Sequence, residues 1–184
     1  KMILVVNVCA QELHFFEFVK PVLGILRNAG IGHEARHYAD LTKKDLSSAD
    51  KIIICGTSLK DFRYSECLQK FSFLNSFEKP VLGICAGAQI IALVNGCSME
   101  KNREIGLQKI LFAKKFLGVS GSTEVYGLHN ACIVKNNLFL EAFEAFSESG
   151  KCVQAFRHRK KPFFGVLFHP EVRNKKMVLE FANL

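Results

Sequence analysis

The chain has 184 residues, of which 49% are hydrophobic and 11% aromatic, and it contains only four prolines. This composition is typical of a compact globular protein and excludes a disordered tail. A chain of this length can bury a substantial core, so we expect residues 1–184 to form a single domain. No apolar run approaches the roughly 20 residues that span a bilayer, and the apolar start is interpreted as a first strand rather than a signal peptide.

The formal net charge is +8, with 25 Lys and Arg residues. Because these cations are spread along the chain, nucleic acid is not the favoured partner. The densest basic run, RHRKK at residues 157–161, is typical of a hairpin tip. We interpret it as a solvated loop or a contact surface for an acidic protein.

The seven cysteines are an odd number, and none lies in a Cys-x-x-Cys pair. The sequence therefore predicts neither a disulfide framework nor a zinc site, and no metal or cofactor is expected. Cysteines scattered in this way are typical of a reducing compartment, so the expected location is the cytoplasm.

The first half of the chain alternates between strand and helix patterns. Residues 3–8 and 51–55 are apolar runs typical of central parallel strands, and residues 31–38 form a weaker strand pattern. Residues 13–28 have the apolar spacing of a helix, which Pro21 should kink or divide. Further along, the patterns predict an amphipathic helix over residues 64–77, a strand over 81–84 and a helix over 86–94.

The second half has a different pattern. Residues 105–134 and 152–168 contain short strand-like runs separated by glycines and charges, which indicates antiparallel strands and hairpins. The predicted fold class is therefore α/β, with a mostly parallel central sheet, helices on both faces and antiparallel strands in the C-terminal half.

Cys85 lies between the predicted strand and helix, with Gly83 and Gly87 two residues to either side. This is the pattern of a nucleophile elbow with cysteine in the serine position. Such a turn would place the sulfur at the C-terminal edge of the sheet and at a helix N-terminus, whose dipole favours a thiolate. The Ala86 N–H would then be ready to bind an oxyanion. Taken alone, the pattern fits a small buried hydrophobic cysteine equally well.

A second candidate motif, FFGVLFHPEV, occupies residues 163–172. Pro170 restricts His169 to extended conformations, in which residues two apart point to the same side. Glu171 could therefore hold the His169 imidazole in one tautomer while the other ring nitrogen faces a substrate or a thiolate. The alternative is a strand-end histidine beside an exposed glutamate.

The two motifs together resemble those of the class I (triad) glutamine amidotransferases. LGICAGAQIIAL at residues 82–93 is similar to the family's LGIC-x-G-x-Q-x-[IL]-A box, and GVLFHPEV at residues 165–172 is similar to its GVQFHPE box. The resemblance covers nearly the whole chain and is nearest to the free-standing glutaminase subunits of archaeal GMP synthases.

The resemblance implies a mechanism for glutamine hydrolysis. Cys85 would attack the side-chain amide carbonyl of glutamine to form a thioester, and His169 would carry the proton to the leaving ammonia and then activate water. Glu171 would orient His169. Ammonia is passed in this family to a synthetase, and since the chain has no P-loop motif, we expect the partner to be a separate ATP-dependent synthetase.

The resemblance also implies positions for the rest of the site. Ala86 and an amide of the loop at Gly56 and Thr57 would hold the oxyanion, and Gln89 would line the glutamine pocket. Relatives carry Ser-Gly-Gly-Pro in that loop, whereas this chain has Cys-Gly-Thr-Ser at residues 55–58. Because threonine resists a positive φ, we expect a different loop conformation here, or one that a partner imposes.

A second departure lies at residues 128–131, Leu-His-Asn-Ala, where relatives of GMP synthase type carry Ser-His-x-Asp. His129 is kept, and the resemblance places this segment toward the synthetase or its substrate. Guanine nucleotide synthesis is the first choice of pathway, followed by anthranilate-type or other amination.

Two other functions are compatible with the sequence. One is a non-catalytic or regulatory paralogue that uses the same fold to bind a partner. The other is a cysteine hydrolase of the related peptidase or chaperone type, although those proteins usually place histidine directly after the cysteine, where this chain has Ala86.

Overall fold

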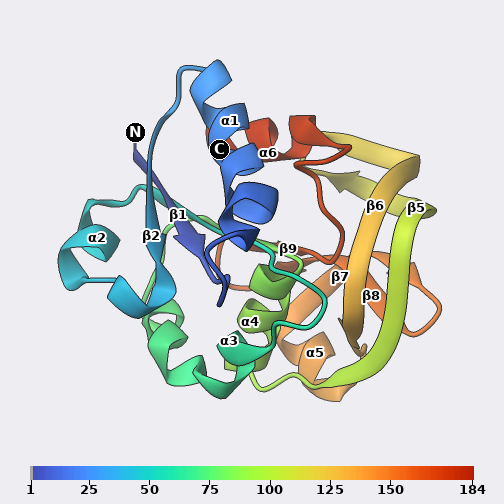
Figure 1. Ribbon diagram of the computed structural model, residues 1–184. Helices are drawn as coiled ribbons and strands as arrows, with labels where there is room; N and C mark the ends of the chain where they lie inside the picture. Colours follow the sequence, from blue (N-terminus) through green and yellow to red (C-terminus); the bar gives the residue numbers. More distant parts are fainter. Residues whose placement is uncertain (1) are drawn as a thin grey trace.

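The computed structural model describes residues 2–184 (Figure 1). Its strands are β1 (Met2–Asn7), β2 (Gly32–His37), β3 (Lys51–Ile54), β4 (Val81–Ile84), β5 (Met99–Phe116), β6 (Val119–Ile133), β7 (Phe143–Ser149), β8 (Cys152–His158) and β9 (Phe163–Val166). Its α-helices are α1 (Lys20–Asn28), α2 (Lys43–Ser48), α3 (Arg63–Glu66), α4 (Ala86–Val94), α5 (Asn137–Ala142) and α6 (Lys175–Asn183). A π-helix η1 (Phe15–Val19) and 3₁₀-helices η2 (Tyr38–Asp40) and η3 (Leu68–Asn75) complete the described elements.

Within residues 2–184, a seven-stranded sheet has the order β2-β1-β3-β4-β9-β8-β7. The strands from β2 to β9 in this order are parallel, and β8 and β7 are antiparallel additions. The predicted fold class is confirmed, because the sheet is mostly parallel and helices cover both faces.

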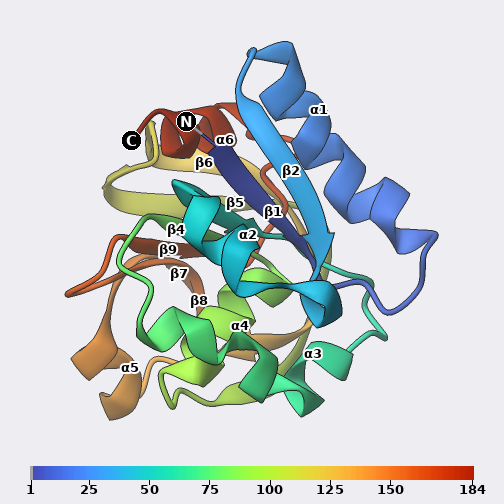
Figure 2. The ribbon, with the colours of Figure 1, turned by 90° about the vertical axis from the view of Figure 1, so that its left-hand side faces the viewer.

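Alternate residues of β1 show how the sheet separates two apolar layers. Ile3 and Val5 belong to the layer that contains α1 and α6, whereas Leu4 and Val6 belong to the layer that contains α4 and η3. Figure 2 shows α6 above, and α4 and α5 below, the strands β4 and β9. A strand buried on both faces must be apolar at every position, which explains the unbroken apolar run in the sequence.

The strands β5 and β6 form a long antiparallel hairpin outside the main sheet. The prediction of short strands here is wrong, since β5 has 18 residues and β6 has 15. Ile110 and Phe112 pack inward, while Ile105, Leu107 and Leu111 are exposed on the outer side. Because one face of the hairpin meets solvent, charges and glycines interrupt the apolar pattern without ending the strands.

Other local predictions differ in their outcome. Pro21 does divide the first helical segment, into η1 and α1. The expected helix over residues 64–77 is instead the single turn α3 followed by η3. Phe71 and Leu74 are the buried side chains of η3, three residues apart, and this spacing matches the 3₁₀ period better than the α period.

A further helix, α2, lies in the polar link between β2 and β3, where none was predicted. Thr42 caps it by accepting a hydrogen bond from the Asp45 N–H, and the Asp45 carboxylate accepts one from the Thr42 N–H in return. This capping box marks the start of α2, which the apolar periodicity of the sequence does not reveal.

A disulfide joins Cys132 to Cys152, with 5.4 Å between their Cα atoms. The expectation that the cysteines form no disulfide is therefore wrong for this pair. Its two residues are 20 positions apart in sequence, and only tertiary packing brings the end of β6 to the start of β8. The bond ties the hairpin to the main sheet.

No helix among residues 2–184 has both the length and the apolar character needed to cross a membrane.

Candidate active site

Cys85 occupies a sharp turn between β4 and α4, with φ 49° and ψ −104°. A Cβ atom at Gly83 would lie 2.5 Å from the Gly87 carbonyl oxygen, and one at Gly87 would overlap the Ile54 carbonyl. Two glycines are thus required for the strand and helix to pack this closely. The predicted elbow geometry is present, and it presents Cys85 at the N-terminus of α4.

The Cys85 side chain is 4% exposed, and its Sγ donates to the Leu128 carbonyl at 3.5 Å. Its backbone N–H donates to Val166 of β9 at 2.8 Å. The same strand leads directly to His169. The fold therefore brings together the two sequence motifs, which lie about eighty residues apart.

His169 and Glu171 form a buried pair, with 2.7 Å between Nδ1 and Oε1. Both side chains are 1% exposed, so the alternative of an exposed glutamate does not apply. The His169 N–H also donates to the Tyr126 carbonyl at 2.8 Å. The opposite ring nitrogen, Nε2, has no hydrogen-bond partner among residues 2–184. It is therefore the ring nitrogen available for proton transfer.

The charge state of His169 follows from its neighbours. Burial by itself lowers the pKa of His169, but the Glu171 carboxylate and then the Cys85 sulfur outweigh this effect. The pKa of His169 therefore stands well above its ordinary value. A protonated imidazole at this position stabilises a neighbouring thiolate.

Gly56 lies against both of these side chains. A Cβ atom at this position would be 2.7 Å from His169 Cε1 and 3.3 Å from Cys85 Cβ. The following residue, Thr57, is not among the described non-glycine residues with positive φ, which are Cys85 and Leu117. The loop at Gly56 therefore lies beside Cys85 and His169, as expected. The Thr57 backbone there does not adopt the strained positive-φ conformation.

Gln89 and Ala86 also lie beside Cys85, but the Gln89 side chain is already engaged. Its Nε2 donates to the Ala131 carbonyl at 2.7 Å, and its Oε1 accepts from the Tyr64 hydroxyl. Burial is the main reason that the pKa of Tyr64 is raised, so this hydroxyl stays protonated as a donor.

The space beside Cys85 is almost closed. A pocket of about 10 Å³ is lined by Thr57, Ser58, Leu59, Asp61, Phe62, Tyr64, Cys85, Ala86, Gln89, Leu128, His129 and Asn130. This volume leaves room for about one water molecule. An open pocket of about 690 Å³ adjoins it and shares Ser58, Leu59, Asp61, Phe62 and Leu128. The Asn130 side chain donates to the Leu59 carbonyl at 2.9 Å and so joins the two sides of the closed pocket.

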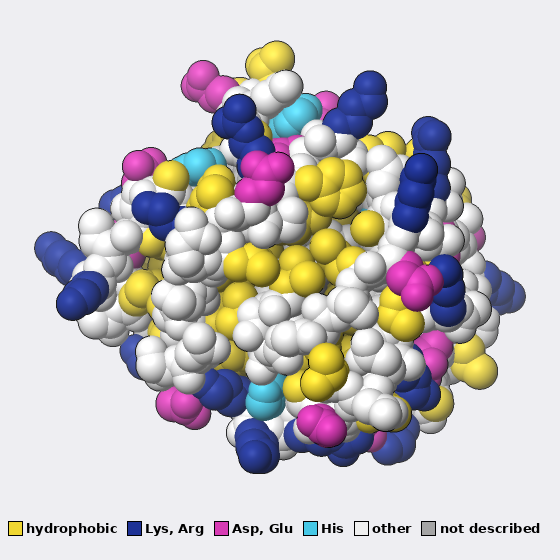
Figure 3. All heavy atoms as spheres, turned by 90° about the horizontal axis from the view of Figure 1, so that it is seen from below, with side chains coloured by type: hydrophobic (Ala, Val, Ile, Leu, Met, Phe, Trp, Pro, Cys, Tyr) yellow, Lys and Arg dark blue, Asp and Glu magenta, His cyan; other side chains and the backbone are white. Residues whose placement is uncertain are grey.

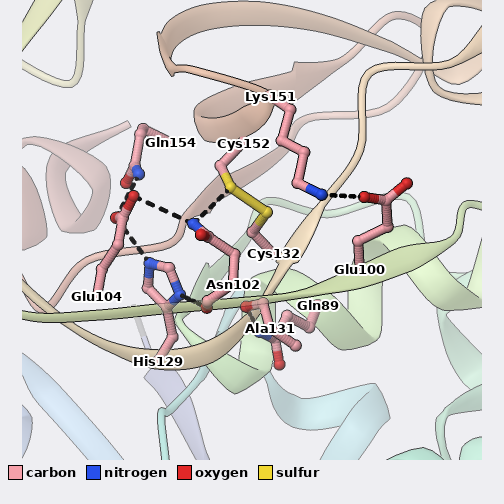
Figure 4. The surroundings of a disulfide bond; sticks show 10 residues. All are labelled: Gln89, Glu100, Asn102, Glu104, His129, Ala131, Cys132, Lys151, Cys152 and Gln154. Atoms are coloured by element: carbon pink, nitrogen blue, oxygen red, sulfur yellow. Dashed lines mark hydrogen bonds and ion pairs between the residues drawn. A yellow bond between two sulfur atoms is a disulfide. The ribbon is translucent and has the colours of Figure 1, made fainter.

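His129 does not face outward as expected, because its side chain is 1% exposed. Figure 4 shows it between Asn102 and Glu104, with Nδ1 3.2 Å from the Asn102 carbonyl and Nε2 3.0 Å from Glu104 Oε2. Burial lowers the pKa of His129 more than Glu104 raises it. The same network includes the disulfide, since Asn102 donates to Cys152 Sγ at 2.9 Å. His129 therefore stabilises the wall of the closed pocket from the protein interior.

Sequence reasoning did not find Asp61 or Tyr64, which the structure brings to the site. Asp61 acts from a loop through the Thr57 hydroxyl, and Tyr64 acts from α3 through the Gln89 side chain, and no spacing rule encodes either contact. Among residues 2–184, no group of three or more His, Cys, Asp or Glu side chains is arranged to hold a metal ion.

Comparisons with known proteins point to one family. The model of the family "Glutamine amidotransferase class-I" matches residues 16–182. A glutamine-hydrolyzing GMP synthase subunit from Picrophilus torridus is 33% identical over 70% of this chain and 71% of its own length. The corresponding GMP synthase subunit from Ignicoccus hospitalis is 32% identical over 83% of this chain and 84% of its own length.

Solved structures share the fold of this chain. A Thermoplasma acidophilum protein, described as a GMP synthase subunit, superposes with a TM-score of 0.85 at 25% identity, over 99% of this chain and 92% of that one. A glutamine amidotransferase from Thermotoga maritima shares the fold, with a TM-score of 0.72 at 17% identity over 98% of this chain and 89% of that one. The chain belongs to the class I glutamine amidotransferase family.

Proposed function

We propose that this chain hydrolyses glutamine to glutamate and ammonia, with Cys85, His169 and Glu171 as the catalytic triad. The Cys85 sulfur attacks the side-chain carbonyl carbon of glutamine, and the C–N bond breaks as His169 gives its Nε2 proton to the departing ammonia. His169 then takes a proton from water, which attacks the γ-glutamyl thioester and releases glutamate.

The observation that carries this proposal is the buried His169–Glu171 pair beside a cysteine at a nucleophile elbow. A carboxylate 2.7 Å from Nδ1 fixes the tautomer that leaves Nε2 facing inward. The Ala86 N–H at the start of α4 and the Thr57 N–H would hold the oxyanion. Gln89 lines the same small pocket and would contribute to the glutamine site.

The ammonia would pass to a separate ATP-dependent synthetase. The relatives from Picrophilus torridus and Ignicoccus hospitalis are named as GMP synthase subunits, so a GMP synthase partner is the first choice. Figure 3 views the side toward which β1 and β2 point, and it shows apolar side chains at the centre, with Lys and Arg interspersed with Asp and Glu around the margin. An apolar centre inside a charged rim suits a protein partner.

The closed pocket favours activation by that partner. A space of about 10 Å³ cannot hold a glutamine side chain, and Gln89 is bonded to Tyr64 and Ala131. The segments around Leu59 and Asn130 must therefore separate before glutamine binds. We expect low activity from the isolated chain and a marked rise with the synthetase.

The same observation supports a second candidate, a non-catalytic paralogue whose pocket never opens. Ammonia release from glutamine, measured with and without the synthetase, separates the two candidates. Activity should be lost in Cys85→Ala and kept in Cys67→Ala, because Cys67 is a free cysteine at the end of α3 and does not line the closed pocket.

Labelling with a diazoketone analogue of glutamine gives an independent readout. A covalent adduct on Cys85 that forms faster in the presence of the synthetase supports the catalytic function. Absence of the adduct under all conditions, together with no ammonia release, would establish the non-catalytic alternative.

A further inference from the structure

One buried carboxylate joins three segments around the candidate oxyanion loop. Asp61 Oδ2 accepts a hydrogen bond from the Thr57 hydroxyl at 2.8 Å and another from the Ala10 N–H at 2.7 Å. Asp61 Oδ1 accepts one from the Arg63 N–H at 3.3 Å. The side chain thus connects the loop after β1, the loop after β3 and the start of α3.

These hydrogen bonds lie in the loop where the chain departs from the Ser-Gly-Gly-Pro pattern of the family that it resembles. The loop holds a single glycine, Gly56, and has no proline after it. A Cβ atom at Gly56 would meet both Cys85 and His169, so the loop lies close enough that a change in its position would disturb these two side chains. The residue that replaces the second glycine, Thr57, brings a hydroxyl, and that hydroxyl is the group bound by Asp61.

We propose that Asp61 is a positioning residue that holds the Thr57 N–H in the direction of the oxyanion. This inference rests on the proposed glutaminase function and adds to it. Asp61 and Thr57 both line the small pocket with Cys85. Asp61 acts through Thr57: two charge-assisted bonds fix the carboxylate to segments outside the loop, and the third fixes Thr57 to the carboxylate.

In this loop, a side-chain hydrogen bond would orient the amide in place of the backbone restrictions that glycine and proline impose. Glycine and proline orient a loop amide through permitted φ values, whereas a hydroxyl–carboxylate bond orients it through a fixed side chain. A clamp of this kind should act mainly on the tetrahedral intermediate, because the oxyanion forms only there. Its loss should lower kcat and leave KM for glutamine nearly unchanged.

The test compares Thr57→Val, Thr57→Ser and Asp61→Ala in the complex with the synthetase. Thr57→Val keeps the shape but removes the hydroxyl, and we expect kcat to fall about tenfold to hundredfold, below the full effect of removing an oxyanion donor. Thr57→Ser, which keeps the hydroxyl, should recover most of that loss. The matched control is Thr123→Val, since the Thr123 hydroxyl bonds the nearby Gly121 carbonyl on the hairpin, and it should leave kcat unchanged.

Two further readouts distinguish positioning from a general loss of structure. A γ-aldehyde analogue of glutamine forms a tetrahedral adduct with the cysteine, and its inhibition constant should rise by the same factor as kcat falls. The double variant Thr57→Val with Asp61→Ala should lose no more than the worse single variant, because the Thr57–Asp61 hydrogen bond that Thr57→Val removes is already absent in Asp61→Ala.

Failure of the positioning role can be distinguished from failure of the proposed glutaminase function. A wild-type complex that releases no ammonia would count against the function, and amide hydrogen exchange at residues 56–58 would then decide the positioning role: faster exchange in Asp61→Ala supports it, and unchanged exchange overturns it. In an active complex, an unchanged kcat in Thr57→Val, a rise in KM alone, or multiplicative losses in the double variant would overturn the role of Asp61.

Discussion

Cys85 has a positive φ of 49°, a conformation that costs a non-glycine residue about 1–3 kcal/mol and persists only where the surroundings enforce it. Those surroundings are Gly83 and Gly87 behind the turn and Gly56 in front of it. The glycine in front is the one that determines where the His169 ring can lie.

Gly56→Ala should therefore displace His169. The added Cβ would lie 2.7 Å from His169 Cε1, so we expect a loss of about hundredfold or more in glutaminase rate from misplacement of the imidazole. The free energy of unfolding should fall by about 1–3 kcal/mol through overpacking.

Gly24→Ala is the matched control, because nothing lies within 4 Å of a Cβ at Gly24 on α1. It should leave the rate unchanged and raise the free energy of unfolding by about 0.5–1 kcal/mol. Equal rates for Gly56→Ala and the wild type would show that the loop and the imidazole are not in contact.

Glu171→Gln tests the buried ion pair through pH. His169 has its pKa raised in the folded chain, so its proton stabilises the fold fully below the ordinary histidine pKa, and this contribution is lost as pH rises through the raised value. At about pH 6, just below the ordinary histidine pKa, the variant should be less stable than the wild type by about 3 kcal/mol. The difference should shrink as the solution becomes alkaline.

Urea denaturation at a series of pH values measures this difference. In a His169→Gln background the proton is absent, so the effect of Glu171→Gln should no longer depend on pH in that range. A stability difference that grows toward alkaline pH would contradict the assigned direction of the shift.

A lysine side chain of strand β3 binds the C-terminal end of helix α6. Lys51, which is 3% exposed, extends its Nζ to the carbonyls of Phe181 and Ala182 at the end of α6, at 3.3 and 2.5 Å. Lys51→Met should leave these carbonyls without that donor and lower the free energy of unfolding by about 1–3 kcal/mol.

Amide hydrogen exchange should report the effect of Lys51→Met within α6 first. Lys176→Met, an exposed change on the same helix, should leave the exchange unaltered. Uniform loss of protection over the whole sheet, with no excess in α6, would refute a local capping role.

The sequence predicted helices and strands well where every position is buried and poorly where one face of the element meets solvent. The continuous apolar runs of β1, β3 and β4 identify strands without help from tertiary structure. The long strands β5 and β6 and the 3₁₀ helix η3 have partial burial patterns that depend on their neighbours. The positions of the proposed triad came from a resemblance between motifs, whereas the contacts of Asp61 depend on two loops and the start of α3 meeting in space, which leaves no periodic signal.

Residues 2–184 form two sheets that are held together partly by the bond between Cys132 and Cys152. Closure of a chain segment of this size, 20 residues, stabilises a fold by roughly 3 kcal/mol in the chain-entropy model. Reduction with a dithiol, or Cys152→Ser, should lower the midpoint of urea unfolding accordingly.

Cys97→Ser serves as the comparison, because Cys97 is a buried free cysteine and its substitution should leave the effect of the dithiol intact. If the unfolding midpoint of the wild type does not respond to dithiol, the covalent link does not contribute in solution.

The nearly filled space beside Cys85 also bears on the chemical survival of the protein. A sulfur that has room beside it for only about one water molecule is out of reach of bulky oxidised thiols such as glutathione disulfide, and of most alkylating drugs. The resting protein would thus store its nucleophile in a protected form. Under the proposed function, covalent inhibitors would act best on the complex with the synthetase, and a screen of compounds against the free chain would overlook them.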